Sequence, residues 1–252
     1  KSFDLAGKQE IFMGNFAEFH ARSINERDAF WAEQAKLVDW KVQPQQICDY
    51  SNPPFAKWFV GGKTNLCHNA VDRHLAERAD QPALIFVSTE TDQEKTYTYR
   101  ELHAEVQRMA AILQSLGVVK GDRVLIYMPM IAEAAFAMLA CVRLGAIHSV
   151  VFGGFASHSL ATRIEDASPK VIISADAGSR GGKGVPYKPL LDEAINLSAH
   201  KPVNVIMVDR KLAAFNPVAG RDVDYATERA KHIDAVVPCE WVDATHPSYT
   251  LY

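Results

Sequence analysis

Two short motifs in this chain combine glycine with apolar or cationic residues in a way that suits a phosphorylated ligand. The first is a β-branched run over residues 147–151 that leads into Phe152-Gly153-Gly154, where backbone without side chains can approach a ligand closely. The second is Arg180-Gly181-Gly182-Lys183, behind another apolar run over residues 171–174. Its cations can neutralise phosphate while its glycines leave space between them. Together the motifs predict a site for a phosphate-bearing ligand.

Neither motif completes a known nucleotide-binding fingerprint. The glycine pair lacks the G-x-G-x-x-G spacing of dinucleotide-binding folds, and the second motif lacks the G-x-x-x-x-G-K-[ST] spacing of a P-loop. Gly184 stands where a P-loop needs Ser or Thr, and Pro186 disfavours a helix that begins directly behind Lys183. A P-loop nucleotide hydrolase is therefore disfavoured, while a solvated glycine-rich turn with surface cations stays a competing interpretation.

The elements that must position these motifs alternate between strand and helix. Apolar runs predict strands near residues 123–128, 147–151, 171–174 and 203–208, and the segments between and after them predict helices near residues 131–143, 157–167 and 189–198. Connections of this length imply right-handed crossovers between parallel strands. We therefore predict an α/β fold with a mainly parallel sheet flanked by helices. In such sheets ligands collect at the carboxyl ends of the strands, where both motifs lie.

Residues 1–60 differ from the rest and predict a helical arm, whereas residues 61–252 predict an α/β body. One or two amphipathic helices are expected between Phe12 and Asp39, with Asn25 as the cap of the second. The tryptophans of the arm are expected to hold it against the body.

Local signals place the elements between the arm and the sheet. A helix is predicted over residues 70–78 and a strand over residues 83–87, followed by a polar hairpin. Thr98 and Glu101 form a T-x-x-E capping box for the helix that follows. A last strand is predicted over residues 249–252.

Charge and hydropathy limit the classes of partner. The 252 residues carry a formal net charge of −3, which gives no extended basic surface for nucleic acid or for an anionic membrane, so small anions are the better ligands. The apolar window over residues 124–142 is divided by Pro129 into a strand and a helix. No transmembrane or signal segment is therefore predicted.

The cysteines and histidines show no metal-binding pattern. Cysteines occur at positions 48, 67, 141 and 239 without a C-x-x-C pair, which predicts free thiols in a reducing, cytoplasmic compartment. The histidines lack H-x-x-x-H spacing, so no metal site is predicted. The sequence Asp72-Arg73-His74 could suggest catalysis, but at the start of a helix it is expected to close a local hydrogen-bond and ion-pair network.

A longer motif resembles a known family. Residues 58–74 fit the pattern W-F-x-G-G-x-x-N-x-x-x-N-x-x-D-R-H, which is similar to a signature of the acetyl- and propionyl-CoA synthetases, a branch of the acyl-CoA synthetases in the adenylate-forming superfamily. Residues 97–102 and 121–124 are similar to features shared across adenylate-forming enzymes, and the resemblance covers nearly the whole chain. The ending over residues 247–252 resembles the strand that precedes the family's phosphate loop.

The resemblance implies a two-step ligation by an acid–thiol ligase. A carboxylate would attack the α-phosphate of Mg-ATP to give an acyl-adenylate and pyrophosphate, and the CoA thiol would then displace AMP to give a thioester. The family's phosphate loop, acyl pocket and catalytic lysine are expected beyond Tyr252. We therefore expect the chain, which begins at Lys1, to be a piece of a longer protein, to carry no catalytic residue and to be inactive alone.

The resemblance also implies that much of the CoA nucleotide site lies in this chain. The site should comprise Phe152, Gly153, Gly154 and the loop Arg180-Gly181-Gly182-Lys183. Arg180 would meet the 3′-phosphate, and the glycine pair would let the pantetheine arm pass close to backbone. Lys183 stands where acetyl-CoA synthetases often have arginine and lacks the planar guanidinium fork. The loop is more similar to that of propionyl-CoA synthetases, so propionate or acetate is the expected carboxylate.

A different class of protein stays open as an alternative. The chain could be a non-catalytic module that binds CoA or a nucleotide, or one that serves interaction alone. An exposed sheet edge at the end of the chain also predicts possible self-association.

Overall fold

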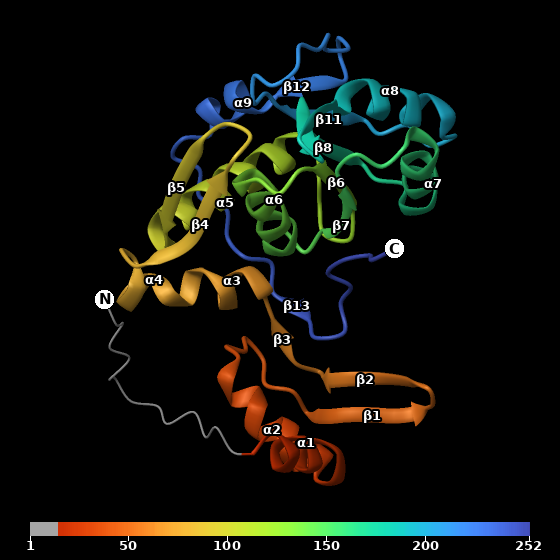
Figure 1. Ribbon diagram of the computed structural model, residues 1–252. Helices are drawn as coiled ribbons and strands as arrows, with labels where there is room; N and C mark the ends of the chain where they lie inside the picture. The colour runs from red at the N-terminus through yellow and green to blue at the C-terminus, as the bar shows by residue number, and fades with distance from the viewer. Residues whose placement is uncertain (1–14) are drawn as a thin grey trace.

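A computed structural model of the protein describes residues 15–252, and its centre is a five-stranded parallel sheet (Figure 1). The strand order is β12-β11-β8-β6-β7, and every neighbouring pair is parallel. The strands are β6 (Arg123–Met128), β7 (Ile147–Phe152), β8 (Val171–Ala175), β11 (Asn204–Val208) and β12 (Asp222–Asp224). The predicted α/β class with a mainly parallel sheet is confirmed.

Helices cover both faces of this sheet (Figure 1). The side chains of β6 alternate, so that Val124 and Ile126 enter one apolar cluster and Leu125 and Tyr127 enter the other. Both faces are therefore buried, which is typical of parallel sheets. The first cluster is closed by α5 (Tyr99–Ser115), α6 (Ala132–Arg143) and α9 (Tyr225–Lys231), and the second by α7 (Ser157–Ala167) and α8 (Tyr187–Leu197).

The apolar window that could resemble a membrane span divides as predicted. Its first part is β6 and its second part is α6, on either side of Pro129. None of the described helices is long and apolar enough to cross a membrane.

The amino-terminal arm is helical at first and then forms a two-stranded antiparallel sheet (Figure 1). The prediction that Asn25 caps the second helix is wrong, because Asn25 is the last residue of the first helix and Glu26 precedes the second without a side-chain cap. The first helix is capped by Asn15, which accepts a hydrogen bond from the amide of Ala17 at 3.2 Å. Phe12, where the first helix was expected to begin, lies outside the described residues. The elements are α1 (Phe16–Asn25), α2 (Arg27–Gln34), η1 (Ala35–Leu37), β1 (Gln46–Asn52) and β2 (Phe55–Val60).

The helix predicted over residues 70–78 is interrupted. Val71 leaves the helical region, with φ −129° and ψ −62°, so three short pieces replace one helix. The break turns Asp72 toward the body of the protein, where it meets Arg143. The pieces are α3 (Leu66–Ala70), η2 (Asp72–His74) and α4 (Leu75–Arg78), preceded by the short strand β3 (Lys63–Thr64).

The hairpin and the capping box that follow are confirmed. β4 (Pro82–Ser88) pairs antiparallel with β5 (Gln93–Thr98). The Thr98 hydroxyl accepts from the Glu101 amide at 3.2 Å, and the Glu101 carboxylate accepts from the Thr98 amide at 2.8 Å. These reciprocal bonds satisfy two amides that the first turn of α5 cannot pair.

The end of the chain forms less strand than predicted. β13 (Val242–Asp243) pairs with β3, and the strand expected over residues 249–252 is reduced to one parallel bridge between His148 and Tyr249. The amide of Thr250 donates to the carbonyl of His148 at 2.9 Å. The remaining length of β7 beyond this bridge is an open edge within the described part of the chain.

Candidate functional site

The Arg180-Gly181-Gly182-Lys183 segment is the tip of a β-hairpin. β9 (Ala177–Arg180) pairs antiparallel with β10 (Lys183–Pro186), so a two-residue turn replaces the open loop expected from the sequence. Both turn residues have positive φ, +58° for Gly181 and +77° for Gly182, a conformation that glycine adopts freely. The Lys183 side chain is exposed beside this turn, and the side chain of Arg180 lies outside what the structure describes.

The glycine pair directly follows β7, an edge strand of the central sheet. Phe152 is the last residue of β7, and its side chain is 65% exposed. Gly154 has a φ of +90°, and no atom lies within 4 Å of where its side chain would begin. Backbone is therefore accessible at Gly154.

A groove extends from the glycine-pair motif to Ser179, the residue before the second motif. It has a volume of about 500 Å³, within the range of small-molecule sites. Its wall includes two residues of the glycine-pair motif, the residue before the second motif, and residues of further loops, among them Glu90, Phe152, Gly153, Ser179, Tyr187 and Arg210. Ser179 immediately precedes Arg180, so the groove runs to the base of the hairpin that carries the two cations.

Gly153 has a structural reason to be glycine. A β-carbon there would lie 2.1 Å from the hydroxyl oxygen of Tyr187, and one at Gly178 would lie 2.2 Å from the same atom. Tyr187 cannot easily move aside, because it is buried at the start of α8 with its ring centroid 5.0 Å from that of Tyr127. The close approach at Gly153 is therefore to Tyr187, and Gly154 is the position left open to a ligand.

Replacing Gly153 by alanine is expected to destabilise the protein by about 1–3 kcal/mol, because the new methyl group overlaps a buried ring. Tyr187→Phe should recover part of this loss by removing the hydroxyl. Thermal denaturation of the two single variants and the double variant measures the coupling between the positions. Gly154→Ala should also destabilise the protein, but because alanine disfavours the positive φ at this position. It should show no coupling to Tyr187→Phe. Additive effects of the Gly153 and Tyr187 changes would contradict the overlap.

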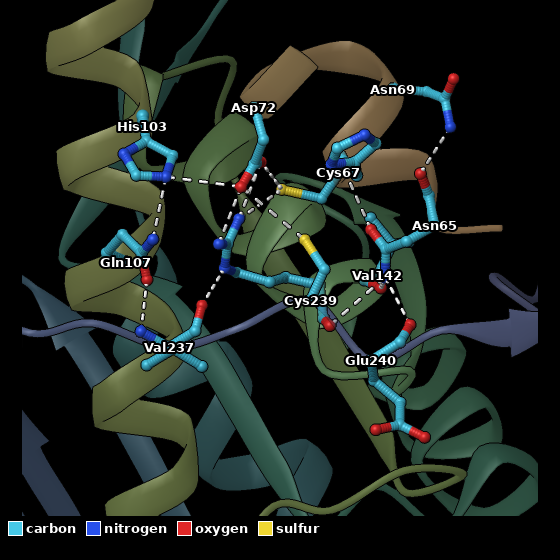
Figure 2. Close-up of polar contacts among 12 residues, drawn as sticks. Asn65, Cys67, Asn69, Asp72, His103, Gln107, Val142, Val237, Cys239 and Glu240 are labelled. Carbon is cyan, nitrogen blue, oxygen red and sulfur yellow. Dashed lines mark hydrogen bonds and ion pairs between the residues drawn. The ribbon is translucent and has the colours of Figure 1, made fainter. Parts of the chain in front are cut away.

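A second polar cluster surrounds Asp72, a residue of the long signature motif (Figure 2). Asp72 receives two hydrogen bonds of 2.9 Å from the Arg143 guanidinium, and the His103 ring lies 3.5 Å from the same carboxylate. Burial favours the neutral carboxyl, but the hydrogen bonds from His103 and Arg143 outweigh burial and hold the pKa of Asp72 well below its usual range. Asp72 thus belongs to an ion-pair network, but its main partner is Arg143, 71 positions away, and not a local residue as expected.

This cluster also brings together two cysteines that are far apart in the sequence. The sulfur atoms of Cys67 and Cys239 and a carboxylate oxygen of Asp72 lie within 4.8 Å of one another. Such a donor set could bind a soft metal ion, but Nη1 of Arg143 lies 3.4 Å from the Cys67 sulfur and 2.9 Å from Asp72. The guanidinium fills the place a cation would take, so the cluster is an ion-pair network. The hydrogen bond with Cys239, together with burial, raises the pKa of the Cys67 thiol.

Asn65 and Asn69, the asparagines of the signature, join separate parts of the chain (Figure 2). The Asn65 amide donates to the carbonyls of Val142 and Glu240, each at 2.8 Å. Asn69 donates to the carbonyl of Asp39 at 3.2 Å and so contacts the arm. The signature thereby fastens the arm, α6 and the segment before β13 to one another, which is a structural role.

Comparison with known families decides the relationship. The family described as AMP-binding enzyme matches residues 71–252. The chain belongs to the AMP-binding enzyme family. Residues 16–70 of this family member match a further description, acetyl-coenzyme A synthetase N-terminus.

Curated relatives in the AMP-binding family have related names. Propionate–CoA ligase of Escherichia coli (strain K12) is 58% identical over 238 residues, which are 94% of this chain and 38% of that ligase. The enzyme of the same name from Salmonella typhimurium is 59% identical with the same coverage. Acetyl-coenzyme A synthetase of Methylobacterium radiotolerans is 49% identical over 94% of this chain and 37% of the relative. The chain therefore spans less than two-fifths of the length of these relatives.

A solved structure supports the fold of this AMP-binding family member. Acetoacetyl-CoA synthetase from Streptomyces lividans superimposes with a TM-score of 0.84 at 29% identity, over 95% of this chain and 36% of that one. The resemblance to short-chain acyl-CoA synthetases expected from residues 58–74 is confirmed.

Two charged residues of the groove were missed by sequence analysis. Glu90 lies in the turn between β4 and β5, and Arg210 follows β11. They form an ion pair across 120 positions of sequence. No local motif contains them both, so only the fold brings them to the hairpin.

Proposed function

We propose that this chain is the amino-terminal part of an ATP-dependent, AMP-forming ligase that joins a short carboxylate to CoA. The observation that carries the proposal is 58–59% identity to propionate–CoA ligases over 94% of the chain. A carboxylate oxygen attacks the α-phosphorus of Mg-ATP and expels pyrophosphate, and the CoA thiolate then attacks the acyl carbon and expels AMP. We place the groups that bind Mg-ATP and the carboxylate in further sequence, so the chain alone is proposed to be inactive.

Propionate is the proposed substrate, with acetate second. The identity to the acetyl-coenzyme A synthetase of Methylobacterium radiotolerans is 49%, about ten percentage points below that to the propionate–CoA ligases. The full-length protein is to be assayed for carboxylate-dependent release of pyrophosphate with both acids. A higher kcat/KM for acetate would reverse the order, and no carboxylate-dependent release would favour the alternative, a non-catalytic CoA-binding or interaction module.

We propose that the CoA nucleotide binds at the groove, against Phe152, Gly153, Gly154 and the hairpin tip Arg180-Gly181-Gly182-Lys183. The support is geometric: Phe152 and Gly153 line the groove, and Gly154 follows them with open backbone. Lys183 is exposed at the tip of the hairpin whose Ser179 also lines the groove. Arg180 and Lys183 are the two cations at the tip, which we assign to the 3′-phosphate of CoA.

Replacing Arg180 by alanine in the full-length protein is expected to weaken CoA binding by about 1–3 kcal/mol while leaving dephospho-CoA nearly unaffected, because only CoA carries the 3′-phosphate. Lys183→Ala should act in the same direction, and Lys183→Arg should retain binding. Isothermal titration calorimetry with both ligands measures the difference. Lys57→Ala, an exposed lysine of β2, is the matched control. Equal losses for the two ligands would remove the phosphate assignment.

The cytoplasmic location and the possible self-association stay predictions. Analytical ultracentrifugation over a range of concentrations would test the self-association, which the open part of the β7 edge supports.

A further inference from the structure

Two charged side chains fasten the base of the hairpin that carries Arg180 and Lys183. Glu90 uses Oε1 to accept a hydrogen bond from the Ser179 amide at 2.6 Å. Its other oxygen, Oε2, accepts from Nη2 of Arg210. Arg210 in turn donates through Nη1 to the carbonyl of Ala177 at 2.9 Å. Glu90 and Arg210 therefore bind strand β9 at two points on either side of Gly178.

Arg210 is itself held in place by a buried carboxylate. Its amide donates to Oδ1 of Asp176 at 3.1 Å, and the amides of Leu212 and Ala213 donate to Oδ2 at 2.7 and 3.0 Å. Asp176 follows β8 directly and is fully buried. The end of the central sheet thus fixes the backbone from which the Arg210 side chain projects.

The ion pair is shielded from water. The side chains of Arg210 and Glu90 are 8% and 23% exposed, so their attraction is screened less than that of a surface pair. A hairpin of two short strands has little stability of its own, and β9 and β10 pair only with each other among the described strands. The position of the hairpin tip therefore depends on the bonds that Glu90 and Arg210 make to Ser179 and Ala177.

We propose that Glu90 and Arg210 are positioning residues that hold the β9–β10 hairpin where its tip cations meet the CoA 3′-phosphate. The proposal rests on the CoA site proposed above. Glu90 and Arg210 act through the hairpin, because their polar atoms are used by Ser179, by Ala177 and by each other. Loss of the bonds from Glu90 and Arg210 to β9 then weakens recognition of the 3′-phosphate more than recognition of the remainder of CoA.

The test uses Glu90→Ala and Glu90→Gln in the full-length protein. Glu90→Ala is expected to weaken CoA binding about tenfold, with less than about a twofold change for dephospho-CoA, because a charge-assisted anchor is lost. Glu90→Gln keeps an acceptor for Ser179 but loses the charge opposite Arg210, so its effect should be smaller. Glu94→Ala is the matched control, since Glu94 is exposed on β5 and its side chain makes no hydrogen bond or ion pair with another described residue.

Amide hydrogen exchange supplies a readout that does not depend on CoA. Glu90→Ala should speed exchange across residues 177–186, and Glu94→Ala should not. If Glu90→Ala binds CoA and exchanges like the wild type while Arg180→Ala loses CoA selectively, the positioning role is overturned and the CoA site stands.

Failure of the CoA site itself has a different outcome. If Arg180→Ala and Lys183→Ala bind both ligands as the wild type does, the site is wrong, and the positioning role is overturned with it. If Glu90→Ala does not fold, Glu90→Gln decides: an unchanged ratio of CoA to dephospho-CoA affinity overturns the proposal.

Discussion

Replacing Asp72 by asparagine is expected to lower the free energy of unfolding by about 3–5 kcal/mol, because it leaves a buried guanidinium without its carboxylate. Arg143 is 3% exposed and makes both of its bidentate bonds to Asp72. Burial lowers the pKa of Arg143, whereas Asp72 outweighs burial and raises it in the wild type. The variant loses this contribution, but the ordinary pKa of arginine lies so far above neutral that the guanidinium stays charged. Urea denaturation followed by tryptophan fluorescence measures the loss.

The pH dependence gives an independent check. The folded-state pKa of Asp72 lies below its value in the unfolded chain, about 3.9, so the stabilisation is present in full above that pH and is lost as the pH falls through the folded-state pKa. The difference between wild type and Asp72→Asn should therefore be smaller at pH 3 than at pH 7. Asp80→Asn is the control, because Asp80 pairs with Arg100 on the surface and both are largely exposed. Equal effects of the two variants would contradict the buried-pair interpretation.

Replacing Asp176 by alanine is expected to cost about 3 kcal/mol of stability, because it leaves three backbone amides without an acceptor. These amides belong to Arg210, Leu212 and Ala213. Asp176→Asn should cost less, since its amide oxygen can still face Leu212 and Ala213 while its nitrogen faces Arg210. Thermal denaturation measures both variants.

The Asp176 prediction also has a local readout. Hydrogen exchange should accelerate at residues 210–213 in Asp176→Ala, where the acceptor is lost. Asp234→Ala is the matched control, because Asp234 is exposed and joined to no other described residue by a hydrogen bond or ion pair. A stability loss with unchanged exchange at residues 210–213 would show that the carboxylate does not hold this loop.

Much of the sheet could be predicted because its signals are local. β6, β8 and β11 are short apolar runs, and α7 has the bounds expected from its periodicity. The capping box of Thr98 and Glu101 needs residues only three positions apart. A local signal can also mislead: Asn25 has a good capping side chain, but it is the last residue of α1, and Glu26 takes the N-cap position of α2.

The remainder of the site could not be predicted because its partners are distant in sequence. The Cys239 sulfur lies 3.9 Å from Asp72 across 167 positions, and Glu90 reaches the Ser179 amide across 89. No spacing rule covers such pairs, since the fold alone sets them. The sequence predicted a close approach to backbone at Gly153. It could not show that the approaching group is the Tyr187 hydroxyl, because that contact forms only when α8 packs beside the end of β7.

The bond between Asn65 and the Glu240 carbonyl has a consequence for synthesis. Its partners are 175 positions apart, and a ribosome adds roughly 5–20 residues per second. The segment around Asn65 therefore waits on the order of ten seconds after it is made before its last partner exists. During that interval the central strands can already pair, whereas the arm that the signature fastens has no complete docking surface. The arm is thus made before the body but completes its attachment to the body only after Glu240 has been added.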